Sequence, residues 1–332
     1  MRILFYSDPH FGLARRENVT ESSLRAREAY CVGYLNQLTQ GYDLVVCLGD
    51  LFDRAHNKEE VILRAAKAVE HTDYILAGNH DLINREGAIS SLNLLKEICP
   101  SKVVLDPMTV TSGVHLHFVP HHRTQAEFDQ ALDVAFSQVN GGKHFLLLHC
   151  NFDSPYADKE QDLNLTGAQA ERLLTRFDTI LIGHEHAGRD LLGGRVKIVG
   201  SLFPTSFGDA EAKHRALVYD TELQSFSEIV TQCNVYEGPA SQYTGDPARG
   251  YLKLFDDMPS GGTSKLAVSL FESGAFAVKI ISSKNVPRGT STEAVASKPV
   301  SLPELVGQML REQDPKLMDL WYEFLAQQRG VV

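Results

Sequence analysis

Five short polar motifs, each placed after a run of apolar residues, constrain this sequence more than any other feature. In chain order they are Asp8-Pro9-His10, Gly49-Asp50, Gly78-Asn79-His80-Asp81, His149, and Gly183-His184-Glu185-His186. The apolar runs before them are short and typical of buried strands. Because the turns that follow strands are where α/β proteins build their sites, the motifs predict one site assembled from distant segments.

The residue types and their spacing favour a site for metal ions. Carboxylate, imidazole and amide oxygen ligands suit hard or borderline divalent cations. In Asp8-x-His10 and His184-x-His186 the two side chains of each pair lie on the same side of an extended backbone, so each pair can converge on one point. Asp50 has two carboxylate oxygens and can bridge two cations about 3.5–4 Å apart. The glycines before three of the motifs permit tight turns.

A purely structural role is a reasonable interpretation of any one motif, since Asp-x-His and Gly-Asp are common. All five in this order disfavour it. The remaining histidines lack this context, and His115 and His117, which alternate along an expected strand without a third ligand, indicate a solvent-facing strand surface. His121-His122-Arg123 is consistent with a polar loop or with an approach to the substrate. Four others are predicted to be exposed: His56, His71, His144 and His214.

Strand-like and helix-like segments alternate as far as residue 230, which predicts a layered α/β domain over residues 1–235. Strands are expected at residues 2–7, 44–48, 74–76, 114–119, 145–148, 179–182, 196–199 and 216–219. Helices are expected at residues 22–40, 58–71 and 124–139, and a fourth should run from a capping box at Thr166 and Gln169 to Phe177.

The composition changes after residue 235 and predicts further units. Breaks that contain glycine and proline mark a small α/β module over residues 236–285. Residues 286–300 are rich in Pro, Gly, Ser and Thr, which predicts a linker. Two amphipathic helices are expected over residues 301–332, with apolar faces that include Leu305, Met309, Leu317, Leu320, Trp321 and Phe324. Either the chain's own core or a partner should cover these faces.

Composition limits the compartment and the partners. The five cysteines are odd in number and scattered, which argues against a disulfide framework and a thiolate metal site. The opening run indicates a first strand instead of a signal peptide, and no stretch has membrane-spanning length. We therefore expect a cytoplasmic protein without a membrane partner, in the host cytoplasm if a phage encodes it. The net charge of -10 disfavours an unaided grip on nucleic acid, but bound cations would reverse the local sign.

Over residues 1 to about 230 the motifs resemble those of the calcineurin-like metallophosphoesterase superfamily. The resemblance implies a four-layer α/β/β/α sandwich and two divalent cations, with Mn²⁺ expected and Mg²⁺, Fe²⁺ or Zn²⁺ as alternatives. It implies one cation held by Asp8, His10, Asp50 and His186, and a second held by Asp50, Asn79, His149 and His184. His80 matches a histidine that is not a ligand but protonates the leaving oxygen or stabilises the transition state.

Within the superfamily the sequence is most similar to SbcD-type DNA-repair nuclease subunits and their bacteriophage recombination counterparts. Gly49-Asp50-Leu51-Phe52 matches the nuclease form of the second motif. Gly200-Ser201-Leu202 and Thr205-Ser206-Phe207-Gly208, with the charged run to Lys213, look like the nuclease segment after the last histidines. These subunits carry a capping domain and a helical segment that docks on an SbcC-type coiled-coil ATPase. The resemblance implies a metal-dependent DNA exonuclease and endonuclease for repair or recombination, and a homodimer.

One position departs from the nuclease pattern. Many of these nucleases have a histidine where this chain has Asp53, and Asp53-Arg54 matches phosphatase relatives instead. There the aspartate orients the catalytic histidine, which suggests an Asp53–His80 dyad with Arg54 near the phosphate. Two alternatives stay open: a stand-alone phosphodiesterase or phosphatase that acts on a small nucleotide or phosphoprotein, and an inactive scaffold. The scaffold is disfavoured because no ligand position is substituted.

Overall fold

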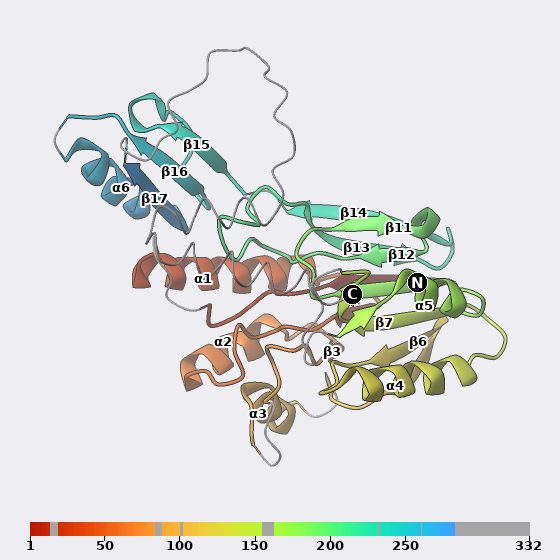
Figure 1. Cartoon of the computed structure of the whole chain (residues 1–332). Helices are drawn as coiled ribbons and strands as arrows, with labels where there is room; N and C mark the ends of the chain where they lie inside the picture. Colours follow the sequence, from red (N-terminus) through yellow and green to blue (C-terminus); the bar gives the residue numbers. More distant parts are fainter. Residues whose placement is uncertain are drawn as a thin grey trace, which may run out of the picture. The chain divides into compact units, whose positions relative to one another are not determined.

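Two six-stranded β-sheets lie face to face, and helices cover their outer faces (Figure 1). This computed structural model describes residues 1–13, 19–83, 88–99, 102–154, 163–231, 233–259 and 261–282. The strand order of the first sheet is β14 (Ser225–Thr231), β13 (His214–Asp220), β1 (Arg2–Tyr6), β2 (Leu44–Cys47), β3 (Tyr74–Leu76) and β4 (Val103–Val104). That of the second is β11 (Arg189–Leu191), β12 (Val196–Ile198), β10 (Thr179–Gly183), β7 (His144–His149), β6 (Val114–Val119) and β5 (Met108–Ser112).

The helices divide between the two outer faces. The first sheet packs against α1 (Glu21–Leu38), α2 (Glu59–Ala68) and α3 (Ser91–Ile98). The second packs against α4 (Gln125–Ser137) and α5 (Gly167–Leu173). Short elements complete this part: β8 (Asn151–Phe152), β9 (Asn164–Leu165) and η1 (Leu192–Gly194). Among the described residues, none of the helices combines the length and the hydrophobicity that a membrane span requires.

Alternation along the central strands explains the layers. In β1, Ile3 and Phe5 point into the core between the sheets, whereas Leu4 and Tyr6 point into the core beneath the helices. Such strands are buried on both faces, which is why their sequences are continuous apolar runs. The predicted four-layer α/β/β/α class is confirmed.

A third, three-stranded parallel sheet follows the two large ones. The sheet and its helix comprise β15 (Val235–Pro239), η2 (Ala240–Gln242), β16 (Tyr251–Asp256), α6 (Gly262–Glu272) and β17 (Ala277–Ser282), named the small unit below. Its strands and helix fall within the predicted module at residues 236–285, apart from its first residue, Val235. The predicted linker at 286–300 and helices at 301–332, with all six proposed partner-binding residues, lie outside the described residues.

Parallel pairing sets the position of the site. β1 pairs with β2 and β2 with β3, all in parallel, and β7 pairs with β10 in parallel. Asp8 and His10 follow β1, Asp50 follows β2, Asn79 and His80 follow β3, His149 is the last residue of β7, and His184 and His186 follow β10. The carboxyl ends of these strands thus carry all five polar motifs to one region.

Candidate metal centre

Backbone strain is concentrated in the loops that follow the strands. Among the described residues, eight non-glycine residues have positive φ, and four of them are predicted metal ligands: Asp8 at 52°, His10 at 48°, Asp50 at 48° and His184 at 86°. Such conformations are uncommon outside glycine and occur at functional sites, where the surrounding structure holds them in place. The strained backbone of these loops is therefore a consequence of the need to present the ligand side chains.

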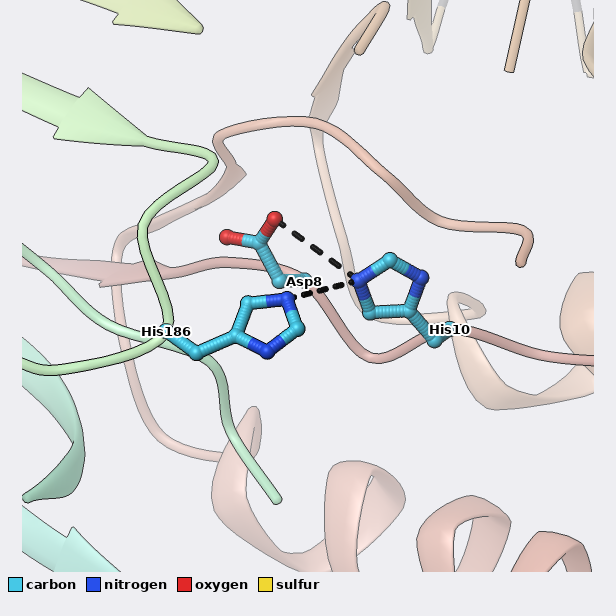
Figure 2. A group of neighbouring side chains, drawn as sticks. All are labelled: Asp8, His10 and His186. Atoms are coloured by element: carbon cyan, nitrogen blue, oxygen red, sulfur yellow. Dashed lines mark hydrogen bonds and ion pairs between the residues drawn. The ribbon is translucent and has the colours of Figure 1, made fainter. Parts of the chain in front are cut away.

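The first ligand group consists of Asp8, His10 and His186 (Figure 2). The Nε2 atom of His10 lies 3.1 Å from Nε2 of His186 and 3.9 Å from Oδ1 of Asp8. Asp8 and His10 are almost completely buried. Neither Oδ1 of Asp8 nor Nδ1 of His10 has a hydrogen-bond partner among the described residues. A buried carboxylate oxygen without a partner is costly, and a cation bound in front of it would supply the missing interaction.

The second ligand group consists of Asp50, His149 and His184, with Asn79 beside them. The Oδ1 atom of Asn79 lies 3.1 Å from Nε2 of His149 and 2.9 Å from Nδ1 of His184. Oδ2 of Asp50 lies 3.3 Å from His149 Nε2 and 3.9 Å from His10 Nε2, so this carboxylate reaches both groups. The donor set and the central position of Asp50 fit a pair of divalent cations.

The glycines in the motifs make room for the ligands. A Cβ atom on Gly78 would lie 2.1 Å from Oδ1 of Asp50, and one on Gly49 would lie 2.3 Å from Nδ1 of His149. Gly49 also has a φ of +106°, a backbone conformation that residues with a side chain rarely adopt. The sequence predicted tight turns at these positions, and the close approach of the ligand side chains adds a second reason for glycine.

Two of the histidines are oriented by their other ring nitrogen. Nδ1 of His149 donates to the main-chain oxygen of Leu48 at 2.7 Å, and Nδ1 of His186 donates to Oδ2 of Asp209 at 2.7 Å. Each contact leaves Nε2 as the ring atom that faces the neighbouring ligands. This arrangement is usual for metal-binding histidines, since the partner fixes both the tautomer and the ring direction.

Burial and neighbouring charges set the protonation of the ligands. Burial lowers the pKa of His10 well below its usual value, and burial together with His149 lowers that of His184 to about 3, so both rings carry a free lone pair near pH 7. Burial opposes ionisation of Asp50, but His149 and His10 hold its pKa below the usual range. Burial would also lower the pKa of His149, but Asp50 raises it to about 9. A cation that binds His149 therefore has to displace a proton.

Two carboxylates support the ligands without being predicted site residues. Asp81 is fully buried and accepts hydrogen bonds from the main-chain N–H groups of Leu51, Phe52 and Gly78, at 3.2, 2.9 and 3.0 Å. It thereby ties the loop after β2 to the loop after β3. Burial and then Asp50 raise the pKa of Asp81 to about 7. Asp209 holds His186 as described above. Asp81 belongs to a motif that the sequence singled out, and Asp209 lies in the charged run before Lys213.

The predicted catalytic residues are placed in different surroundings. His80 is half-buried; its main-chain N–H donates to Oδ1 of Asp50 at 2.9 Å, and its ring lies edge-on to that of His10. Nδ1 of His80 donates to the main-chain oxygen of Asp53 at 2.7 Å, whereas Oδ1 of Asp53 lies 3.7 Å from Nδ1 of His10. Asp53 therefore contacts His80 through its main-chain oxygen. Arg54 is exposed and lines a cleft between α1 and α2.

Three histidines that were predicted to be exposed are buried. His117 and His144 belong to neighbouring strands, and Nε2 of His117 lies 2.8 Å from Nδ1 of His144. His214 lies against Ser201, whose hydroxyl is 2.9 Å from its Nδ1 atom. The prediction was wrong because an imidazole can be buried at little cost in free energy when its ring nitrogens are hydrogen-bonded inside the protein. The sequence pattern does not reveal these hydrogen-bond partners. His121 lies near the ligands, with its ring centroid 6.5 Å from that of His149.

Comparison with known proteins identifies the family. The family model for calcineurin-like phosphoesterases matches residues 1–188, a range that contains all seven predicted ligand positions. The chain belongs to this family, and it is a hydrolase with metallophosphoesterase-type activity. The family uses divalent metals, and the two ligand groups above are the candidate positions for them.

Several solved structures are similar to this chain at low sequence identity. An archaeal phosphodiesterase is 17% identical with a TM-score of 0.35, over 70% of this chain and 100% of its own. A putative 5'-nucleotidase from Staphylococcus aureus is 14% identical with a TM-score of 0.38, over 82% of this chain and 58% of its own. A predicted phosphoesterase from Streptococcus pneumoniae is 13% identical with a TM-score of 0.31, over 69% and 97%. No curated protein gives a significant match.

Proposed function

We propose that this chain is a DNA nuclease subunit that hydrolyses phosphodiester bonds at a centre of two divalent cations, Mn²⁺ first among them. One observation carries the proposal. The segment at residues 205–208, which resembles the nuclease segment, is part of the loop whose Asp209 holds the ligand His186. The segment that bears the nuclease resemblance therefore helps to hold Asp209, which orients the predicted ligand His186.

Different residues of the chain have different roles in phosphodiester hydrolysis. Two divalent cations bound here would polarise the phosphoryl group and acidify a water molecule. Asp8, Asp50 and the ligand histidines would hold these cations and thereby set where the phosphate docks, and the buried surroundings would strengthen each charge interaction there. Because Nδ1 of His80 donates to a carbonyl oxygen, Nε2 is the atom left to donate a proton to the departing oxygen.

A partner is part of the proposal. The net charge of -10 leaves little capacity to grip DNA over a wide surface without help. We propose that residues 301–332 dock their apolar faces on the coiled coil of an SbcC-type ATPase, which would supply further contacts to the DNA. A chain that ends at Pro299 should then lose the partner while it keeps metal-dependent cleavage of a small phosphodiester. Retained binding of the ATPase by the shortened chain would exclude this docking site.

A stand-alone phosphodiesterase or phosphatase is the second candidate function. It is favoured by Asp53, which forms a compact group with His10 and His80 at the edge of the metal centre. In phosphatase relatives the corresponding aspartate orients the catalytic histidine. Turnover of a small nucleotide or phosphoprotein that greatly exceeds DNA cleavage would favour this function.

The decisive experiment is degradation of an end-labelled linear DNA duplex by the purified chain with Mn²⁺, beside an EDTA control. Asp50→Asn tests the metal centre, and Asp220→Asn, at the end of β13, is its matched control. A generic ester, bis(4-nitrophenyl) phosphate, measures phosphodiester chemistry apart from DNA binding. DNA cleavage that is lost with EDTA and with Asp50→Asn, but not with Asp220→Asn, would support the nuclease. Cleavage of the small ester alone, also after addition of the ATPase, would reject it.

A further inference from the structure

We infer that Tyr251 of the small unit is a positioning residue for the metal centre, which it reaches through the loop that holds His186. The inference deepens the proposed function, since it rests on the proposed two-cation chemistry. It makes the small unit a functional part of the site, although none of its residues is a predicted ligand.

The contact between the small unit and the loop is a hydrogen bond in a buried place. The hydroxyl of Tyr251, a residue only 3% exposed, donates to the main-chain oxygen of Pro204 at 2.6 Å. Nη2 of Arg27, from α1, donates to the same oxygen at 3.2 Å. A carbonyl oxygen has two lone pairs and can accept both bonds. Proline also fixes its own φ angle, so Pro204 is a stiff start to the loop that follows.

The loop that begins at Pro204 closes around Asp209. Oδ2 of Asp209 accepts from the main-chain N–H of Thr205 at 3.0 Å, and Oδ1 accepts from that of Ser206 at 2.8 Å. The hydroxyls of the same two residues donate to Asp209 at 3.1 and 2.9 Å. Oδ2 also accepts the 2.7 Å bond from His186. The carboxylate therefore keeps its position relative to His186 only while residues 204–206 keep theirs.

Packing strengthens the same connection. The ring of Phe207, in the middle of the loop, meets the ring of Tyr251 edge-on, with centroids 5.9 Å apart. Ala210, directly after Asp209, is buried in one cluster with Tyr251, Phe276 and Ala277. Phe207 and Ala210, which flank Asp209 in the sequence, thus both pack against the small unit.

Because Tyr251 holds the loop that positions His186, loss of its hydroxyl should weaken metal binding. Removal of a group that orients a metal-binding histidine typically costs about 10–100-fold in metal affinity or activity. Tyr251 acts through one further step, so we expect a smaller loss for Tyr251→Phe, of roughly 3–10-fold in Mn²⁺ affinity. The substitution keeps the ring, and Arg27 still satisfies Pro204, so the fold should be preserved.

Tyr236 provides a matched control inside the same unit. Its hydroxyl donates to the main-chain oxygen of Pro239 at 2.8 Å, and both residues belong to β15. Tyr236→Phe therefore removes the same kind of tyrosine-to-proline bond without touching the loop at residues 204–209.

The experiment measures the full-length chain by two methods that do not require catalysis. Calorimetric titration with Mn²⁺ gives the metal affinity, and deuterium exchange of the metal-free chain gives the protection of the Thr205 and Ser206 amides. We expect Tyr251→Phe to bind Mn²⁺ more weakly and to exchange these amides faster, and Tyr236→Phe to behave as the parent chain. Unchanged affinity and exchange in Tyr251→Phe, or equal losses in both variants, would overturn the inference.

Hydrolysis of bis(4-nitrophenyl) phosphate across a range of Mn²⁺ concentrations separates positioning from general damage. In Tyr251→Phe we expect a higher Mn²⁺ requirement and recovery of kcat at saturating metal; a kcat that stays low at saturation would count against positioning. Failure of the nuclease proposal is distinguishable from failure of this inference, because the Mn²⁺ affinities are compared whether or not the chain cleaves DNA.

Discussion

Buried carboxylates that are not metal ligands tie the loops of the centre together. Asp81 accepts three main-chain N–H groups from two loops that are about 30 residues apart in the sequence. One of these loops presents Asp50, and the other presents Asn79 and His80. Asp81 therefore helps to fix the position of Asp50 relative to Asn79 and His80.

Replacement of Asp81 by alanine should destabilise the chain strongly. Each buried N–H group that loses its acceptor costs about 1–3 kcal/mol, so the loss of three acceptor contacts in Asp81→Ala should lower the free energy of unfolding by roughly 3–9 kcal/mol. Chemical denaturation in EDTA measures this without a contribution from metals. Asp220→Ala is the control: Asp220 accepts from the main-chain N–H groups of Glu222 and Leu223 in an exposed turn, where water can replace it. A loss for Asp81→Ala as small as that of the control would contradict the prediction.

His80 should affect turnover and leave metal binding almost intact. It lies beside the ligands with Nε2 left to face a substrate, and general acid catalysis contributes typically about 10²–10⁴-fold. We expect His80→Ala to lower kcat for bis(4-nitrophenyl) phosphate within this range, while calorimetry still shows Mn²⁺ binding. His71→Ala, an exposed position after α2, is the control. Normal turnover by a metal-loaded His80→Ala chain would reject the role of His80.

Single residues differ in how far the sequence can predict them. The seven predicted ligands are brought together because each lies at or just after the carboxyl end of a strand, and the apolar run that forms the strand can be recognised in the local sequence. Asp81 and Asp209 received no role because their function lies in N–H groups and a histidine ring that only the folded chain brings to them. The buried His117, His144 and His214 were missed for the same reason.

At the scale of elements, strands β6 and β7 carry a row of histidines away from the metal centre. The rings of His115 and His144 are stacked with centroids 4.3 Å apart, and His144 is also bonded to His117. Nδ1 of His117 lies 3.0 Å from the hydroxyl of Thr109 on β5. Burial, then His144 and His115, lower the pKa of His117 to about 4 from its ordinary 6.5.

Because of His117 on β6, the free energy of unfolding should decrease in mildly acidic solution. Below pH 6.5 the unfolded chain takes up a proton at His117, but the folded chain does not until about pH 4, so stability decreases as pH falls through this window. At about 1.4 kcal/mol for each pKa unit the loss approaches roughly 3 kcal/mol. In EDTA, the free energy of unfolding of the parent chain should drop between pH 7.5 and 4.5 by about 2–3 kcal/mol more than that of His117→Phe. Parallel pH profiles would show that His117 does not titrate in this way.

The longer elements were predictable because their signals are local. The capping box of Thr166 and Gln169 is present at the start of α5, with both reciprocal bonds. The predicted strands all occur, with ends that differ by up to two residues. The sequence did not predict α3, with eight residues, or the edge strands β4, β5, β11 and β14. Edge strands gain their hydrogen bonds from one neighbour, and β4 and β11 are only two and three residues long, so their sequences are less distinctive.

For the whole molecule, the layered core was predictable from the apolar runs, and the apolar surface outside it was not. Several large hydrophobic side chains remain exposed on and beside α2 and α3: Leu63 at 57%, Ile89 at 62%, Leu94 at 45% and Ile98 at 59%. Helices α2 and α3 pack together against the first sheet (Figure 1). Leu94 and Ile98 are four residues apart and lie on one face of α3, and an exposed apolar helix face is suited to a protein–protein interface.

We propose that this face joins two copies of the chain in the homodimer that the nuclease resemblance implies. In a two-fold interface each side chain occurs twice, so one substitution introduces two charges into the buried area. The chain should sediment as a dimer at micromolar concentrations, and the double variant Leu94→Glu, Ile98→Glu should sediment as a monomer because the glutamates would lose water on association. Leu223→Glu is the matched control, since Leu223 is 75% exposed in the turn between β13 and β14. A monomeric parent chain would show that the chain does not form this dimer. A double variant that remains dimeric would show that the interface lies elsewhere.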